Sequence, residues 1–85
     1  MNIREKNKLY YRLLATAPLN VRRADDNNIK LHKYSWTYDG MTIDACRIFP
    51  LAYYAVVFNA ATDTMEHFHG ARARRLYEHG KKHSR

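Results

Sequence analysis

The chain has 85 residues, a net charge of +7 and one cysteine, so we expect a single small domain with no internal disulfide. Its hydrophobic content of 46% excludes a disordered chain, and no apolar run reaches the about 18 residues that a membrane-spanning helix needs. The positive charge favours nucleic acid, or else an acidic protein surface, as the partner, and the lone cysteine favours the cytoplasm as the location.

The first predicted element is an amphipathic helix from about Ile3 to Ala17. Asn2 and Glu5 have the spacing of a capping box at its start, and Pro18 ends it because the residue before a proline avoids the helical conformation. Apolar residues at three- and four-residue spacings share one face: Leu9, Tyr10, Leu13, Leu14 and Ala17. Every fourth residue on the other face is basic, which suits a phosphate backbone or an acidic partner, although an ordinary solvated helix has the same pattern. This basic ridge consists of Arg4, Lys8 and Arg12.

Leu19 to Asn28 is a predicted connector, because its second half is rich in turn-forming residues. A β-hairpin follows from Ile29 to Phe49, where Asp39-Gly40 has the sequence of a two-residue turn between alternating runs. This turn sets the register. Tyr38 is predicted to lie opposite Met41, Trp36 opposite Ile43, Tyr34 opposite Ala45, and His32 opposite Arg47.

The predicted hairpin has an apolar face and a polar face. The apolar face, which we expect in the core, carries Tyr34, Trp36, Tyr38, Met41, Ile43 and Ala45. Ser35, Thr37, Thr42 and Asp44 lie on the other face. Because buried Trp and Tyr anchor small cores, we favour core packing over base stacking for the three aromatic residues, although bases also stack on such rings next to basic residues.

A third strand is predicted from Leu51 to Phe58, after Pro50 ends the hairpin. The run is apolar at every position. This pattern predicts a strand that is covered on both faces, with helices supplying at least one of the covers.

The segment after the third strand allows two interpretations. In one, a single helix capped by Asp63 runs to His79. In the other, which we favour, Thr64 to His69 is a fourth strand and a shorter helix starts after Gly70, which keeps this glycine out of a helix interior. Both interpretations end the helix at Gly80.

The predicted fold is therefore an α+β domain in residues 1–80. An antiparallel sheet of three or four strands lies between an N-terminal and a C-terminal helix, in the order α-β-β-β-(β)-α. Residues 81–85 form a flexible basic tail.

No motif indicates catalysis or a cofactor. His67 and His69 lie two apart on the favoured strand and so point the same way, but a zinc centre needs three or four ligands at characteristic spacings. Cys46 lies within a strand and has no catalytic signature around it. We therefore predict that the protein is not an enzyme and holds neither a metal nor a cofactor.

The order of a helix, antiparallel strands and an arginine-bearing helix resembles that of double-stranded-RNA-binding domains over most of the chain. Arg72, Arg74 and Arg75 lie where that family carries a basic cluster, so the resemblance implies contact with RNA there. In its size, its basicity and the segments Arg23–Asn27 and Tyr53–Phe58, the chain also resembles the short accessory proteins that T7-like tailed phages make against their hosts. That resemblance implies action in the host cytoplasm by binding a host enzyme or nucleic acid, without catalysis.

We expect a small nucleic-acid-binding protein that contacts phosphates through basic residues from both ends of the chain, which the fold gathers into one patch. The predicted contact residues are Arg4, Lys8, Arg12, Arg72, Arg74, Arg75, Lys81 and Lys82. Arg22 and Arg23 are weighted below these, because Asp25 and Asp26 follow closely enough to neutralise them.

The alternative is a protein that binds and inhibits or redirects a host enzyme, such as a nuclease or polymerase, by docking its basic surface on an acidic groove. A third explanation of the net positive charge is that it only keeps the protein soluble. The sequence leaves open whether the protein is a monomer or a homodimer.

Overall fold

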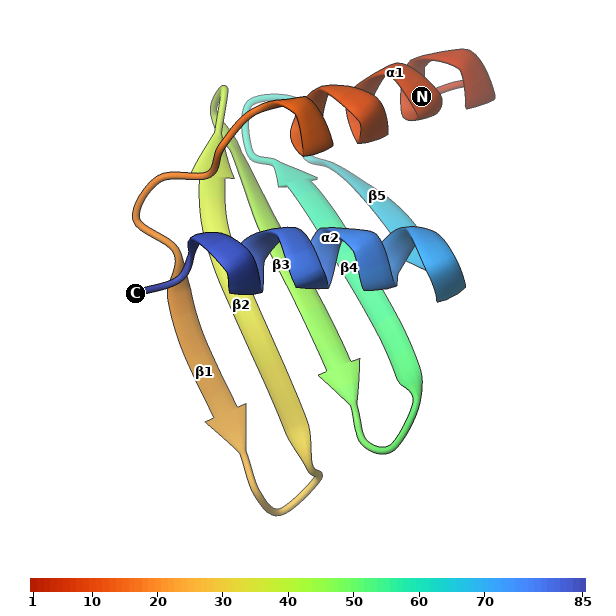
Figure 1. Cartoon of the computed structure of the whole chain (residues 1–85). Coiled ribbons are helices and arrows are strands. Elements are labelled where there is room, and N and C mark those ends of the chain that lie inside the picture. The colour runs from red at the N-terminus through yellow and green to blue at the C-terminus, as the bar shows by residue number, and fades with distance from the viewer.

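The computed structural model describes residues 1–85, which fold into a five-stranded antiparallel sheet with a helix at each end of the chain (Figure 1). The elements in chain order are α1 (Ile3–Ala15), β1 (Arg22–Asp26), β2 (Leu31–Tyr38), β3 (Met41–Ile48), β4 (Ala52–Asn59), β5 (Thr64–His69) and α2 (Gly70–His83). Strands that follow one another in the chain are neighbours in the sheet, in the order β1-β2-β3-β4-β5. The predicted α+β class is confirmed, but the sheet has five strands rather than three or four.

The strand that the sequence does not predict is β1. It lies at the edge of the sheet, where Arg23 is opposite Tyr34 of β2, and all of its side chains are exposed. A strand exposed on both faces needs no apolar alternation, so its polar sequence is typical of a loop. The predicted connector from Leu19 to Asn28 is therefore wrong over Arg22–Asp26.

The hairpin formed by β2 and β3 has the predicted register, with Trp36 opposite Ile43 and Tyr34 opposite Ala45. Asp39 and Gly40 at its turn have φ angles of 50° and 74°, which an Asp-Gly pair tolerates well. The face predicted to be apolar is the buried one, and of its six residues only Tyr38 is more than 7% exposed.

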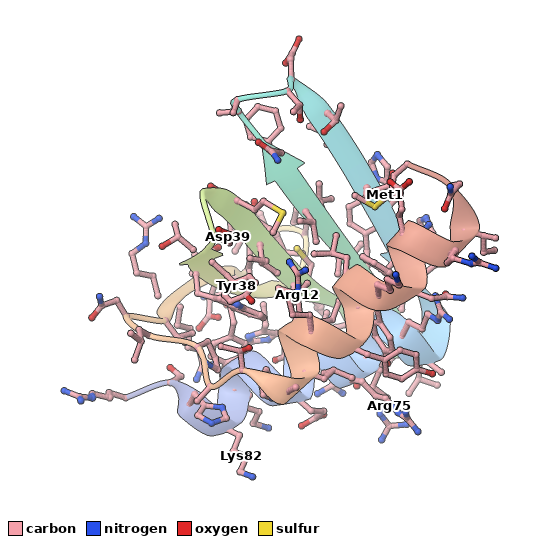
Figure 2. The ribbon with its side chains drawn as sticks, turned by 90° about the horizontal axis from the view of Figure 1, so that it is seen from above. Met1, Arg12, Tyr38, Asp39, Arg75 and Lys82 are labelled. Carbon is pink, nitrogen blue, oxygen red and sulfur yellow. The ribbon has the colours of Figure 1, made fainter.

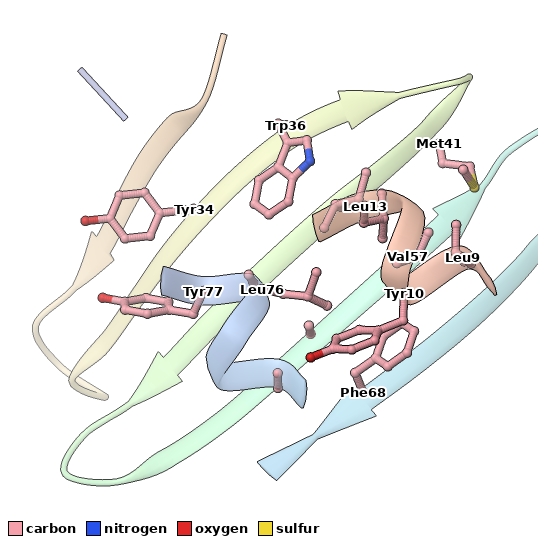
Figure 3. Packing of buried hydrophobic residues seen from close by; sticks show 14 residues of the cluster. Leu9, Tyr10, Leu13, Tyr34, Trp36, Met41, Val57, Phe68, Leu76 and Tyr77 are labelled. Carbon is pink, nitrogen blue, oxygen red and sulfur yellow. The ribbon is translucent and has the colours of Figure 1, made fainter. Parts of the chain in front are cut away.

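Both helices lie on this face of the sheet and close a single core over it (Figure 1). α1 contributes Leu9, Tyr10 and Leu13, and α2 contributes Ala73, Leu76 and Tyr77. Figure 3 shows the rings of Tyr10 and Phe68 in contact, with centroids 5.6 Å apart. The core thus joins both ends of the chain to the middle of the sheet.

The favoured interpretation of the C-terminal part is correct at its start and wrong at its end. β5 is the fourth predicted strand, and α2 begins at Gly70, whose φ of +61° favours glycine. The helix then continues through Gly80 to His83, so the predicted end at Gly80 is wrong. Lys81 and Lys82 belong to the last turn of α2 rather than to a flexible tail.

The second face of the sheet carries no helix, and we call it the open face. Its residues are Arg22, Ala24, Asp26, Leu31, Lys33, Ser35, Thr37, Thr42, Asp44, Cys46, Ile48, Ala52, Tyr54, Val56, Phe58, Met65, His67 and His69. The sequence predicts that the apolar strand β4 is covered on both faces. That prediction is wrong, because the helices cover only one face and Tyr54, Val56 and Phe58 remain half-buried on the other.

Candidate nucleic-acid interface

The two helices bring the ends of the chain together. They run in the same direction across one face of the sheet (Figure 1). Nε2 of His79 in α2 donates a hydrogen bond of 2.9 Å to the carbonyl of Thr16, directly after α1. The basic residues of both ends therefore lie in one layer of the molecule, which we call the helix layer (α1 and α2).

The predicted ridge of α1 stays together along one side of the helix. Arg4 and Lys8 are exposed and line a hollow of about 680 Å³ along the helix. Arg12 also borders this hollow, but its Nη1 lies 3.9 Å from Oδ2 of Asp39 in the β2–β3 turn. Figure 2 shows Arg12 directed toward Asp39. Arg12 is thus the one member of the ridge with a carboxylate within 4.0 Å, and Lys8 and Arg12 both also border a smaller hollow that contains Asp39.

A second hollow, of about 540 Å³, lies along α2 next to Leu14 of α1. Its cations are Arg74, Arg75 and Lys82, and its acid is Glu78. Arg75 and Lys82 are exposed and project from the helix layer on the side away from the sheet (Figure 2). The outward surface of the helix layer is therefore basic along both helices.

Aromatic rings hold two of the α2 arginines in place. The guanidinium carbon of Arg72 lies 4.9 Å from the ring centroid of Tyr10, and that of Arg74 lies 5.7 Å from the ring centroid of Tyr53. Such cation–π contacts restrain the side chain and leave guanidinium N–H groups at the ring edge for a ligand. The side chain of Arg72 is half-buried, whereas that of Arg74 is exposed.

Acids do little to neutralise the eight predicted contact residues. Arg12 alone among them has a carboxylate within 4.0 Å. Glu66 pairs instead with Lys6 and with the N-terminal amine of Met1, each at 3.8 Å. The positive charge of the helix layer is therefore largely unpaired.

The arginines of β1 have different surroundings. Nε of Arg23 donates to Oδ1 of Asp25 at 3.2 Å, and Nδ1 of His32 lies 3.0 Å from the same oxygen. This hydrogen bond between Arg23 and Asp25 lowers the pKa of Asp25 and raises the pKa of Arg23. The expectation that a nearby acid neutralises this pair is confirmed for Arg23, whereas Arg22 has no acid within 4.0 Å.

An aromatic cluster on the open face is a feature that the sequence does not predict. The hydroxyl of Tyr54 and Nδ1 of His67 are 2.6 Å apart, and the ring centroids of Tyr54 and His69 are 5.1 Å apart. The rings of His67 and His69 are within 9° of parallel, with centroids 6.5 Å apart. The two histidines point the same way, as predicted, but Tyr54 joins them only through the pairing of β4 with β5. The alternation along each strand indicates which side chains of that strand share a face. It does not indicate that β4 and β5 are neighbours in the sheet.

Metal-ligating side chains meet in pairs, such as His67 with His69, but not in larger groups. No group of three or more His, Cys, Asp or Glu residues is arranged to hold a metal ion. Cys46 is 8% exposed, and its burial raises the pKa of the thiol. A thiol that stays protonated is a poor nucleophile.

Comparison with protein-family models, with curated proteins and with solved structures finds no match to this chain. Neither helix combines the length and the apolar character that are needed to cross a membrane.

Proposed function

We propose that this protein is a small non-enzymatic nucleic-acid-binding protein that contacts phosphates through its helix layer. The observation that carries the proposal is the outward basic surface of the two helices. Arg4 and Lys8 of α1 and Arg75 and Lys82 of α2 are exposed there, and none has a carboxylate within 4.0 Å.

Unpaired cations on neighbouring helices match the repeated negative charge of a phosphate backbone. Arg72 and Arg74, which are restrained by aromatic rings, extend this surface along α2, and a planar guanidinium can hold a phosphate with two parallel hydrogen bonds. Contacts of this kind depend on backbone charge more than on base sequence. The buried free thiol of Cys46 and the resemblance to phage accessory proteins support action in a reducing cytoplasm, that of a host if the protein is made by a phage.

The salt dependence of binding tests the proposal. Fluorescence anisotropy of a labelled duplex and a labelled single strand should show an affinity that falls steeply from low to physiological salt, because bound cations displace counterions. Arg75→Gln and Lys82→Gln should each weaken binding to both and reduce the salt slope by about 1.

Lys30→Gln is the matched control. It removes one positive charge from the β1–β2 turn, which lies outside the helix layer, and should change the affinity little. Binding that is undetectable or independent of salt would contradict the proposal, as would an equal loss in the control.

A protein partner is the second candidate, because the hollow along α2 combines its cations with Leu14 and Glu78. Apolar and mixed-charge surfaces suit a protein better than a bare phosphate backbone. In this candidate the protein binds and inhibits or redirects a host enzyme such as a nuclease or polymerase. Pull-down from a nuclease-treated lysate distinguishes the two: a specific protein retained after nucleic acid is removed supports this candidate, and the loss of all partners supports nucleic-acid binding.

A further inference from the structure

The sheet exposes flat aromatic side chains on the open face. His67 and His69 are exposed neighbours on β5, with nearly parallel rings. Tyr54 of β4 lies beside both rings, and Phe58 follows along the same face of β4. The part of the open face formed by β4 and β5 therefore offers several π-surfaces to a ligand.

Positive charge lies on the same face, two strands away from the nearest of these rings. Lys33 of β2 shares a row of the sheet with Tyr54 of β4, and two strand spacings separate their backbones by about 10 Å. Neither Lys33 nor Arg22 has a carboxylate within 4.0 Å. The acids of this face are Asp26 on β1 and Asp44 on β3. Asp44 shares a row of the sheet with Val56 and His67, and it accepts a hydrogen bond from the hydroxyl of Ser35. One nucleotide can bridge the span from ring to cation, with its base at one end and its phosphate at the other.

We propose that the open face binds single-stranded nucleic acid by stacking its bases on Tyr54, His67 and His69, with Lys33 near the phosphates. Aromatic side chains take bases in this way without regard to sequence, because every base has a π-face. Bases in a duplex are already stacked on one another, so this face selects single strands. The open face uses other residues than the helix layer, lies on the opposite side of the molecule, and does not depend on phosphate binding there.

Charge complementarity favours this ligand over a second copy of the chain. A second copy carries the same charge of +7, so electrostatic repulsion opposes the packing of two open faces, whereas a polyanion is attracted. On the β5 edge of the face two of the three side chains are exposed imidazoles, and the third is the exposed Met65.

Three labelled ligands test the proposal by fluorescence anisotropy: an oligodeoxythymidine of about 12 nucleotides, an abasic strand with the same backbone, and a duplex of the same length. The wild-type protein should bind oligodeoxythymidine more tightly than the abasic strand. The double variant His67→Ala/His69→Ala should lose about tenfold or more in affinity for oligodeoxythymidine. Its affinity for the abasic strand should not change.

Two further variants separate stacking from other causes. His67→Phe/His69→Phe keeps the rings and should keep the affinity for oligodeoxythymidine. Phe49→Ala removes a ring that is 52% exposed in the β3–β4 turn, away from the open face, and should have no effect. Thermal unfolding shows that each variant is folded before binding is measured.

The outcomes also separate this proposal from phosphate binding by the helix layer. Arg75→Gln and Lys82→Gln should weaken binding of the abasic strand and oligodeoxythymidine alike, and their failure to do so counts only against the helix layer. Equal affinity of the wild-type protein for the normal and the abasic strand would overturn the stacking proposal. An unchanged affinity in His67→Ala/His69→Ala, or an equal loss in Phe49→Ala, would overturn it too.

Discussion

Gly80 of α2 lies so close to Trp36 of β2 that a Cβ atom at position 80 would be 2.6 Å from Cζ3 of the indole ring. The helix backbone therefore rests directly on the aromatic side chains of β2, including Tyr34, whose Cβ would be 3.0 Å from the same atom. A glycine inside a helix costs about 1 kcal/mol relative to alanine. Here that cost is offset by the close approach of the helix layer to the sheet.

Gly80→Ala should lower the free energy of unfolding. Overpacking a buried site costs about 1–3 kcal/mol, and the gain in helix propensity recovers about 1 kcal/mol of it. Urea unfolding followed by circular dichroism measures the net effect. Lys81→Ala, at the exposed neighbouring position, is the control and should change stability by less than about 0.5 kcal/mol. A Gly80→Ala protein that is more stable than the wild type would show that the helix is free to move away from Trp36.

His79→Phe should destabilise the contact between the two helices by about 1 kcal/mol. The ring centroids of His79 and Trp36 are 6.4 Å apart, and phenylalanine keeps a ring in this place. A phenylalanine side chain cannot donate the hydrogen bond to the carbonyl of Thr16. Hydrogen exchange should then show faster opening at the C-terminal end of α1. His79→Gln, which retains a donor, should lose less stability, and equal losses in the two variants would argue against a role for the hydrogen bond.

Asp25 should contribute stability that depends on pH. Its pKa is lowered from the ordinary value of 3.8, chiefly by the hydrogen bond from Arg23. A carboxylate with a lowered pKa stabilises the fold above the unfolded-state pKa, and this contribution is lost as the pH falls through the folded-state pKa. Asp25→Asn should therefore be less stable than the wild type at about pH 6, and the difference should disappear as the pH falls through the lowered folded-state pKa of Asp25. Both side chains are exposed, so the effect is small and shrinks in high salt. Asp63→Asn, which removes a carboxylate without an ion pair, should show no such dependence.

Cys46 should react slowly with a thiol reagent in the native protein. The side chain is 8% exposed and burial raises its pKa, so both access and the thiolate fraction are low at neutral pH. Absorbance after addition of an aromatic disulfide measures the rate. The same chain unfolded in urea should react much faster, and equal rates in the two states would mean that the thiol is open to solvent.

Glu78→Gln should strengthen nucleic-acid binding by the helix layer. Glu78 is the carboxylate in the hollow that Arg74, Arg75 and Lys82 line, and its removal relieves repulsion of a phosphate. An effect of about two- to fivefold is expected for an exposed charge. Anisotropy at low salt measures it. An unchanged or weaker affinity would favour the protein-partner candidate, in which Glu78 meets a complementary charge.

The sequence by itself determines the elements whose signals are local. The capping box at Asn2 and Glu5 is formed, with the side chain of Asn2 accepting a hydrogen bond of 2.9 Å from the backbone of Glu5. The turn at Asp39 and Gly40 sets the β2–β3 register, and the alternation around Trp36 identifies the core face. Each of these depends on residues that are close in the chain, so it can be predicted without knowledge of the rest of the fold.

Only the tertiary structure decides the features that depend on distant segments. β1 has no apolar pattern and forms because β2 offers it an edge to pair with. Gly80 lies inside α2, where the close approach of the helix to Trp36 leaves no room for a side chain. Arg12 turns toward Asp39, and Tyr54 meets His67 and His69 only when β4 pairs with β5. The cations of the two helices share one layer only because both helices pack on the same face of the sheet. Contacts between residues that are far apart in the chain form only after the sheet has brought their segments together, so no local pattern encodes them.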